Sequence, residues 1–234
     1  MAVDPSRILF EDNHLLIYNK RPGDIVQGDK TGDTPLSEEI KDYIKSTYNK
    51  PGDVYLGVAH RIDRPVSGVI IFARTSKALI RLNQMLKAGA ITKTYWAITS
   101  QAPPSEKDHL VHYIVRNEKQ NKSYAHLKSV DNSKMGELEY QLMCISDHYY
   151  LLEINLMTGR HHQIRAQMAQ LGCPIKGDLK YGAKRSNPNG SIHLHARTVE
   201  FTHPVRKELI KIDADPPDDP LWSHFKKQIL TPAK

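Results

Sequence analysis

The chain has 234 residues, of which 33 are Lys or Arg and 26 are Asp or Glu, giving a formal charge of +7 and a pI near 9.2. Hydrophobic residues make up 39% and charged residues 25%, which excludes an intrinsically disordered chain and a collagen-like fibre. Two distant cysteines, Cys144 and Cys173, exclude a disulfide scaffold and a cysteine-based zinc module. We therefore expect a globular cytoplasmic protein.

The N-terminal segment and the apolar runs argue against export and membrane insertion. No apolar stretch flanked by positive charge opens the chain, and the run 68–73 is far shorter than the roughly 18 residues that a membrane span needs. The basic balance favours polyanionic partners such as nucleic acid. A solvated basic surface is the common alternative.

Apolar periodicity predicts strands and helices in alternation through the first half of the chain. The expected elements are strands within 7–20, a helix at 35–48, strands at 55–59 and 68–73, a helix at 76–89 and a strand at 94–98. Thr34 suits an N-cap, with Pro35 at the first helical position, and Gly89 suits a C-cap.

The second half predicts more strands. Its expected elements are several strands within 109–157, a helix at 161–171, a late strand at 193–201 and a helix at 220–229. Neither an internal repeat nor a linker is visible, so a single domain covering 1–234 is expected. An acidic, proline-containing stretch opens its last part, 213–234.

A charged loop, His60-Arg61-Ile62-Asp63-Arg64-Pro65-Val66-Ser67, lies between two predicted apolar strands. If Arg61 and Arg64 converge on Asp63, they lower the pKa of its carboxyl and keep it ionised at neutral pH. An ionised carboxylate can act as a nucleophile or a base. The alternative is a surface turn with solvated charges.

A second polar constellation is Thr158-Gly159-Arg160-His161-His162-Gln163-Ile164-Arg165. A tight turn at Gly159 followed by a helix directs backbone N–H groups toward an anion, and Arg160, His161, Gln163 and Arg165 add side-chain donors. This segment is not a Walker loop, because no Gly-Lys-Ser/Thr follows. An ordinary basic first turn of a helix is the alternative.

Histidines and aromatic residues suggest further sites. His193 and His195 share one face of a predicted strand, but no HExxH motif occurs, so hydrogen-bonding or RNA-contacting histidines explain them more simply than a metal. Tyr95, preceded by Lys93, could present an aromatic face for base stacking. Its alternative is a place in the core.

These motifs together resemble the RluA-type pseudouridine synthases, a family of RNA-modifying isomerases. Residues 60–68 resemble the HRLDxxTSG signature, and residues 11–20 its opening segment. The strand KTYWA, the segment LMTGRHHQIR, the turn GDLKYG and the closing LHA…HP follow in the family's order. The likeness covers about residues 7–212.

The sequence departs from the family pattern at few positions. Val66 stands where the family has Thr, Ile62 replaces Leu, and Arg21 separates Lys20 from Pro22. Val66 cannot supply a hydroxyl, so a hydrogen bond from that position is not expected. Because the catalytic opening begins by residue 7, no N-terminal S4 RNA-binding domain is expected.

The resemblance implies an α+β fold, the pseudouridine synthase fold: a mixed, mostly antiparallel central sheet with peripheral helices and a basic active-site cleft. It implies that Asp63 is the nucleophile, that Tyr95 lies against the base and that Arg165 pairs with Asp63. The implied substrate-binding residues are His60, Arg61, Arg64, Arg160, His161, Gln163 and Leu194. No cofactor and no metal are expected.

The implied activity is the conversion of uridine to pseudouridine in a structured RNA, either tRNA or rRNA, by a monomer. Two other readings stay open: a non-catalytic RNA-binding protein on the same scaffold and a metal-dependent hydrolase. Turnover on RNA would exclude the non-catalytic binding protein, and a bound metal together with loss of activity in chelator would identify the hydrolase.

Overall fold

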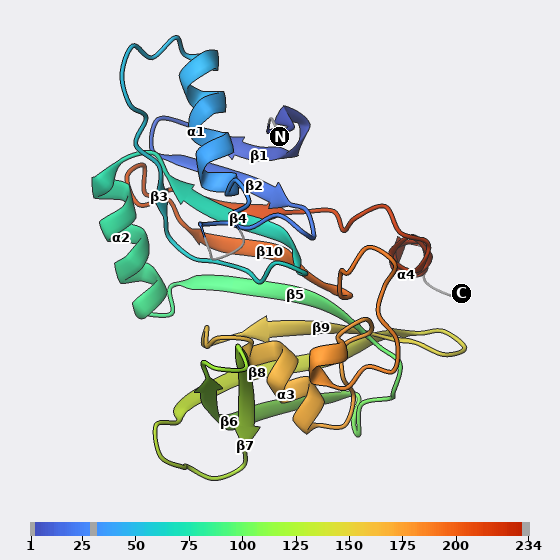
Figure 1. The fold of residues 1–234 in the computed structure, drawn as a ribbon. Helices are drawn as coiled ribbons and strands as arrows, with labels where there is room; N and C mark the ends of the chain where they lie inside the picture. Colours follow the sequence, from blue (N-terminus) through green and yellow to red (C-terminus); the bar gives the residue numbers. More distant parts are fainter. Residues whose placement is uncertain (1–2, 29–31, 231–234) are drawn as a thin grey trace. The chain divides into compact units, whose positions relative to one another are not determined.

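The computed structural model describes residues 3–28 and 32–230. The chain forms two compact units, Met1–Ile91 with Ala196–Asp215 and Thr92–His195 with Pro216–Lys234 (Figure 1). Each unit contains mainly antiparallel strand pairs with helices beside them, so the predicted α+β architecture is confirmed.

The first unit is built on a sheet with the neighbour order β1-β2-β4-β10. The bounds are β1 (Ile8–Glu11), β2 (Leu15–Lys20), β4 (Ser67–Ala73) and β10 (Leu194–Thr202), whose first two residues belong to the other unit. The short β3 (Gly57–Val58) pairs with β4, and β11 (Leu209–Asp213) pairs with β10. A 3₁₀ turn, Pro5–Arg7, precedes β1.

Strand β4 is buried along its whole length because a helix covers each of its faces. Val69 and Ile71 pack with the helix α2 (Ser76–Lys87), whereas Ile70 and Phe72 pack with the helix α1 (Leu36–Thr47) (Figure 1). This alternation is the period of two that an extended chain imposes. It explains why the sequence reads as a continuous apolar run.

The predicted boundaries need three corrections in this unit. Helix α1 begins at Leu36, so Pro35 is the N-cap and Thr34 is not. The strand expected at 55–59 shrinks to Gly57–Val58. The C-cap of α2 is Ala88, and Gly89 follows it in the left-handed conformation, with φ +69°. Both helices nevertheless exist where the apolar period predicts them.

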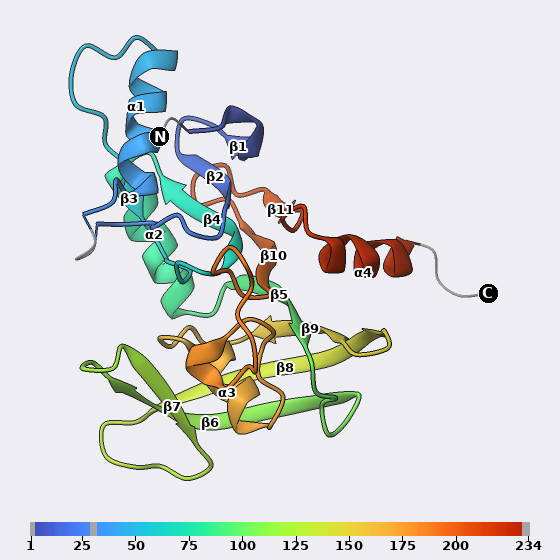
Figure 2. The same cartoon turned by 45° about the vertical axis from the view of Figure 1, so that its right-hand side comes forward.

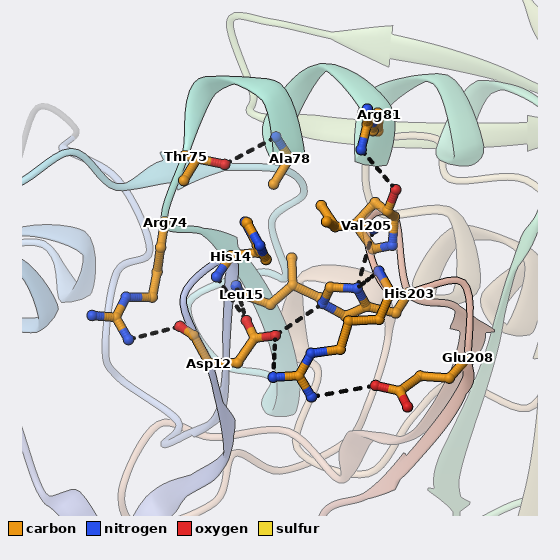
Figure 3. A network of polar contacts seen from close by, with 12 residues as sticks. Asp12, His14, Leu15, Arg74, Thr75, Ala78, Arg81, His203, Val205 and Glu208 are labelled. Atoms are coloured by element: carbon orange, nitrogen blue, oxygen red, sulfur yellow. Dashed lines mark hydrogen bonds and ion pairs between the residues drawn. The ribbon is translucent and has the colours of Figure 1, made fainter.

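A polar network joins the β1–β2 turn to the turn after β10 (Figure 3). Oδ1 of Asp12 accepts the N–H groups of His14 and Leu15, each at 2.7 Å, while its Oδ2 lies 3.2 Å from His203 Nε2 and 3.1 Å from Arg206 Nη2. Burial raises the pKa of Asp12, but the N–H groups of His14 and Leu15, together with the neighbouring His203 and Arg206 side chains, outweigh it, and the pKa lies below its usual value. An ionised Asp12 therefore fixes both turns.

The second unit holds the strands in the order β5-β9-β8-β6-β7, all paired antiparallel. Their bounds are β5 (Ile91–Thr99, from Thr92 in this unit), β9 (Tyr150–Leu156), β8 (Lys134–Ile145), β6 (Lys107–Asn117) and β7 (Lys122–His126). Helix α3 (Gln163–Gln170) packs against β6 and β7, as Figure 2 shows. A 3₁₀ turn, Leu179–Tyr181, follows it.

The other helix of this unit is α4 (Pro220–Leu230), close to the prediction at 220–229. Its Trp222 and Phe225 pack with Trp96 and Ile98 of β5. Among the described residues, no helix is long and apolar enough to cross a membrane.

Candidate active site

The predicted site residues divide between the two units. The first unit carries His60, Arg61, Asp63 and Arg64, and the second carries Tyr95, Arg160, His161, Gln163, Arg165 and Leu194. The approach of Arg165 to Asp63 joins residues of different units and stays a prediction.

The loop that carries Asp63 is anchored by a lysine with no solvent-exposed surface. Lys20, at the end of β2, donates from Nζ to the carbonyl oxygens of Arg21 at 2.7 Å, Asp24 at 2.8 Å and Arg64 at 3.2 Å. The Arg64 oxygen also accepts the N–H of Gly23 at 2.8 Å. One ammonium group thus joins the Arg21–Asp24 loop to the Asp63 loop.

The electrostatic surroundings of Lys20 connect it to Asp63. Loss of solvent lowers the pKa of Lys20 to about 7, and the negative charges of Asp24 and Asp63 oppose that shift. The Asp63 carboxylate therefore favours the charged form of Lys20. Sequence analysis assigned Lys20 only to the opening motif, without a role.

Backbone contacts set the shape of the same loop. The carbonyl oxygen of Asp63 accepts the N–H of Val66 at 3.0 Å, which closes a tight turn before β4. His60 accepts the N–H of Ile71 on Nε2 at 3.1 Å, so this ring nitrogen holds β4. Gly68 has φ +116°, and a Cβ there would lie 2.2 Å from the Ala196 carbonyl oxygen. Only glycine fits such an approach.

Sequence analysis considered that Arg61 and Arg64 converge on Asp63, but the ion pair that the structure gives for Arg64 is with another carboxylate. Arg64 forms an ion pair with Asp33, with 2.8 Å between Nη2 and Oδ2, and both side chains are about half exposed. Arg61 is exposed to solvent. The carboxylate partner of Arg64 is therefore a residue that sequence analysis did not consider.

In the second unit, Gln163 organises the loop before α3. Its Oε1 accepts the Thr158 hydroxyl at 2.8 Å and the Arg160 N–H at 2.9 Å, and its Nε2 donates to the Glu137 carbonyl oxygen at 3.1 Å. Arg160 donates from Nε to the Met135 carbonyl oxygen at 2.8 Å. These groups, expected as substrate donors, bind the loop to β8.

Two stacked histidines precede α3. His162 has φ +52°, a left-handed conformation that costs a non-glycine residue roughly 1–2 kcal/mol. Its ring stacks on His161 with 3.8 Å between centroids, and its Nδ1 lies 2.9 Å from the Tyr181 hydroxyl. Because that hydroxyl accepts the Ser123 N–H at 2.8 Å, its own proton is directed to His162. His161 Nδ1 lies 2.8 Å from the Ser123 hydroxyl.

Arg165 forms a buried bidentate ion pair with Asp178. Its Nε and Nη2 donate to the two carboxylate oxygens at 2.7 Å and 2.8 Å, and the side chains are only 6% and 1% exposed. The ring of Tyr181 lies under the guanidinium, 4.9 Å from its central carbon. This contact holds the plane of the guanidinium as well as its position.

Sequence analysis missed Asp178 and Tyr181 as partners of Arg165. The turn GDLKYG that contains both was part of the family likeness, but no role was attached to either side chain. Gly177 before it has φ +90°, and a Cβ there would meet Asn187 at 2.8 Å. Gly177 therefore permits the tight backbone conformation immediately before Asp178.

Tyr95 lies on the same face of the second unit's sheet as α3. It is buried and pairs with Ile154, which in turn pairs with Tyr140. Directly opposed residues share a face of the sheet. On β6 the residue opposite Tyr140 is Asp108, and Ile114, an even number of residues further along this strand, lies on the same face and packs on Ala166 of α3. This unit therefore gathers Tyr95 and the helix of Arg165 on one side.

Leu194 is buried at the start of β10. Within the described residues, no group of three or more His, Cys, Asp or Glu side chains could hold a metal ion.

Comparison with known proteins relates this arrangement to one family. Residues 14–170 match the family described as RNA pseudouridylate synthase. A Bacillus subtilis protein named uncharacterized RNA pseudouridine synthase YhcT is 32% identical over 213 residues, which cover 91% of this chain and 69% of that protein. Ribosomal large subunit pseudouridine synthase D of Xylella fastidiosa is 31% identical over 229 residues, covering 92% and 67%.

A solved structure supports the fold. Human RNA pseudouridylate synthase domain containing 4 superposes with a TM-score of 0.78 at 22% identity, covering 97% of this chain and 94% of the human one. The fold and the motifs thus define an RNA-modifying isomerase. The chain belongs to the RNA pseudouridylate synthase family, and its activity is the isomerisation of uridine to pseudouridine in RNA.

Proposed function

We propose that Asp63 is the nucleophile of this isomerisation and that both units act as one catalytic domain. The carboxylate attacks C1′ of the ribose, and the bond between C1′ and N1 of uracil breaks. The uracil turns within the site, its C5 displaces the carboxylate from C1′, the proton leaves C5, and N1 gains a proton. The reaction consumes neither a redox equivalent nor a nucleotide.

The observation that carries this proposal is the anchoring of the Asp63 loop by the buried Lys20. A nucleophile must be held in one place and kept ionised to act. Three backbone carbonyl groups bind the Lys20 ammonium, and the charge of Asp63 acts on it within the same unit. A solvated surface turn would not require a fully buried cation beneath it.

The remaining roles are those that the resemblance to the pseudouridine synthases implies, and they are part of the proposal. Tyr95 stacks on the uracil and assists removal of the C5 proton, and Arg165 keeps Asp63 ionised. Arg61, which is exposed, helps to hold the target nucleotide out of the RNA stack. We assign His60, Arg64, Arg160, His161, Gln163 and Leu194 to substrate binding, partly through the loops that they shape.

The proposed substrate is a structured tRNA or rRNA. The relatives named as ribosomal large subunit pseudouridine synthases favour rRNA. We propose that the enzyme acts as a monomer in the cytoplasm and that its basic surface selects the RNA. The non-catalytic RNA-binding protein is the competing function.

Release of tritium tests the proposal directly. Transcribed rRNA and tRNA that contain [5-³H]uridine lose tritium to water when C5 becomes bonded to C1′. Wild-type protein should release it, Asp63→Asn should not, and Asp53→Asn, which changes an exposed turn in the same unit, should match wild type. Release by Asp63→Asn at the wild-type rate would refute the nucleophile. No release by the wild type from either RNA would favour the binding protein.

A further inference from the structure

Lys93 is a cation that none of the assignments above uses. It lies on β5 two residues before Tyr95, so the two side chains are on the same face of the strand. Its Nζ is 3.7 Å from the position that a Cβ on Gly159 would occupy. Strand β5 thus brings an ammonium group to the loop that leads into α3, on the side of Tyr95.

Within the described residues, the Lys93 ammonium has neither a hydrogen-bond acceptor nor a carboxylate partner. Three other cations in the described residues do have partners: Lys20 is bound by three carbonyl groups, Arg165 by Asp178 and Lys41 by Glu38. Lys93 is half-buried, and loss of solvent lowers its pKa with no opposing charge. An ammonium that loses water without gaining a partner costs free energy.

The surroundings of Lys93 suit an incoming anion. Gly159 is exposed and has no side chain, so the backbone beside the ammonium is open. The next residue, Arg160, is also exposed, and its guanidinium is fixed by the Met135 carbonyl oxygen. A compact ammonium beside an open loop binds the oxygen atoms of a phosphate as a point charge.

We propose that Lys93 and the backbone at Gly159 form a binding site for one phosphate of the RNA strand that carries the target uridine. The inference rests on the proposed function, because it assumes that the Tyr95 face meets the base. The phosphate supplies the counter-charge that Lys93 lacks in the free protein. The site would then position the backbone while Tyr95 contacts the uracil, which is the usual division between phosphate and base contacts.

The salt dependence of binding tests the site without requiring turnover. A fluorescein-labelled ten-nucleotide oligouridylate is titrated by anisotropy at several KCl concentrations. Loss of one phosphate contact lowers the slope of log affinity against log salt by about 0.7 for a single strand. Lys93→Met should show this loss, and Lys93→Arg should retain most of the wild-type slope.

Lys41→Met is the matched control, because it removes the same charge from a lysine that is already paired, 2.9 Å from Glu38. It should keep the wild-type slope. A wild-type slope in Lys93→Met, or an equal loss in Lys41→Met, would overturn the proposal.

A stability measurement separates binding from packing. If Lys93 is held ready for a phosphate, Lys93→Met removes an uncompensated charge, and the urea midpoint should stay or rise. A lower midpoint with an unchanged slope would assign Lys93 to the core. The Asp63→Asn protein should bind oligouridylate with the wild-type slope, so a failure of the nucleophile proposal does not resemble a failure of the phosphate site.

Discussion

Replacement of Asp178 by alanine removes the carboxylate that binds two nitrogen atoms of the buried Arg165 guanidinium. The two side chains are 6% and 1% exposed, so water cannot replace the lost carboxylate without a rearrangement. Breaking one partner of a buried pair costs about 3–5 kcal/mol, and we expect this loss for Asp178→Ala. Asp178→Asn keeps one acceptor oxygen and should lose about 2 kcal/mol.

A double-mutant cycle measures the pair itself. Urea unfolding of wild type, Asp178→Asn, Arg165→Met and the double variant gives the free energy of unfolding for each. Arg165→Met should lower the free energy of unfolding much less in the Asp178→Asn protein than in the wild type, and the difference, the coupling energy, should be about 2 kcal/mol. Strictly additive losses would refute the ion pair as a stabilising unit.

The same variant has a functional consequence. If Arg165 acts on Asp63, its misplacement by Asp178→Asn should lower kcat at least about 10-fold, while KM for RNA stays near the wild-type value. Tritium release at saturating and subsaturating RNA measures both constants. A change confined to KM would assign Asp178 to substrate binding instead of positioning.

Three further predictions concern single positions. Gly68→Ala should destabilise the first unit by more than about 2 kcal/mol in urea unfolding, because φ is +116° and the new Cβ would meet the Ala196 backbone. A loss below about 0.5 kcal/mol, the size expected of a neutral surface substitution, would contradict this. Lys20 has a folded-state pKa of about 7, below its unfolded value, so the unfolded chain binds more protons between about pH 7 and 10.5, and the free energy of unfolding rises with pH by at most about 1.4 kcal/mol per pH unit. Lys20→Met should lack this rise. If wild type and Lys20→Met showed the same change in the free energy of unfolding between about pH 7.5 and 9, the prediction would be wrong. Tyr181→Phe should keep the cation–π contact with Arg165 but should lower the free energy of unfolding by about 1–3 kcal/mol, because the Ser123 N–H loses its acceptor. Tyr181→Leu removes the aromatic ring as well and should also lower kcat. Equal kcat values for the two variants would show that Tyr181 does not position Arg165.

The layers of the first unit could be predicted from the sequence because their signals are local. The run from Val69 to Phe72 is apolar at every position, and Leu36, Ile40 and Ile44 recur at helical spacing. Element ends were harder to place. Thr34 has the chemistry of an N-cap, but the helix starts after Pro35 without a side-chain cap. The short strand β11 was not predicted.

The candidate site was predictable only as a set of residue types in a known order. The loop around Asp63 and the segment before Arg165 were both recognised from their motifs. Their internal contacts were not, because a sequence does not show which acceptor a buried donor reaches. The ion pair of Arg165 with Asp178 spans 13 residues, and the bond from Lys20 to the Arg64 carbonyl spans 44.

Two of the residues expected to bind RNA also form hydrogen bonds with the protein backbone. Gln163 has the donors of an anion site, yet its amide binds the backbone of Arg160 and Glu137. His60 likewise receives the N–H of Ile71. A buried polar side chain and the backbone groups around it must satisfy one another, and a motif does not show these contacts.

The central claim is that this chain forms pseudouridine through Asp63. The most direct measurement is pseudouridine mapping of all tRNA and rRNA from cells with the gene, without it, and without it but expressing Asp63→Asn. We predict that at least one site is lost with the gene, is restored by the wild-type protein and is not restored by Asp63→Asn at equal protein abundance. An unchanged map in the absence of the gene, or full restoration by Asp63→Asn, would contradict the account.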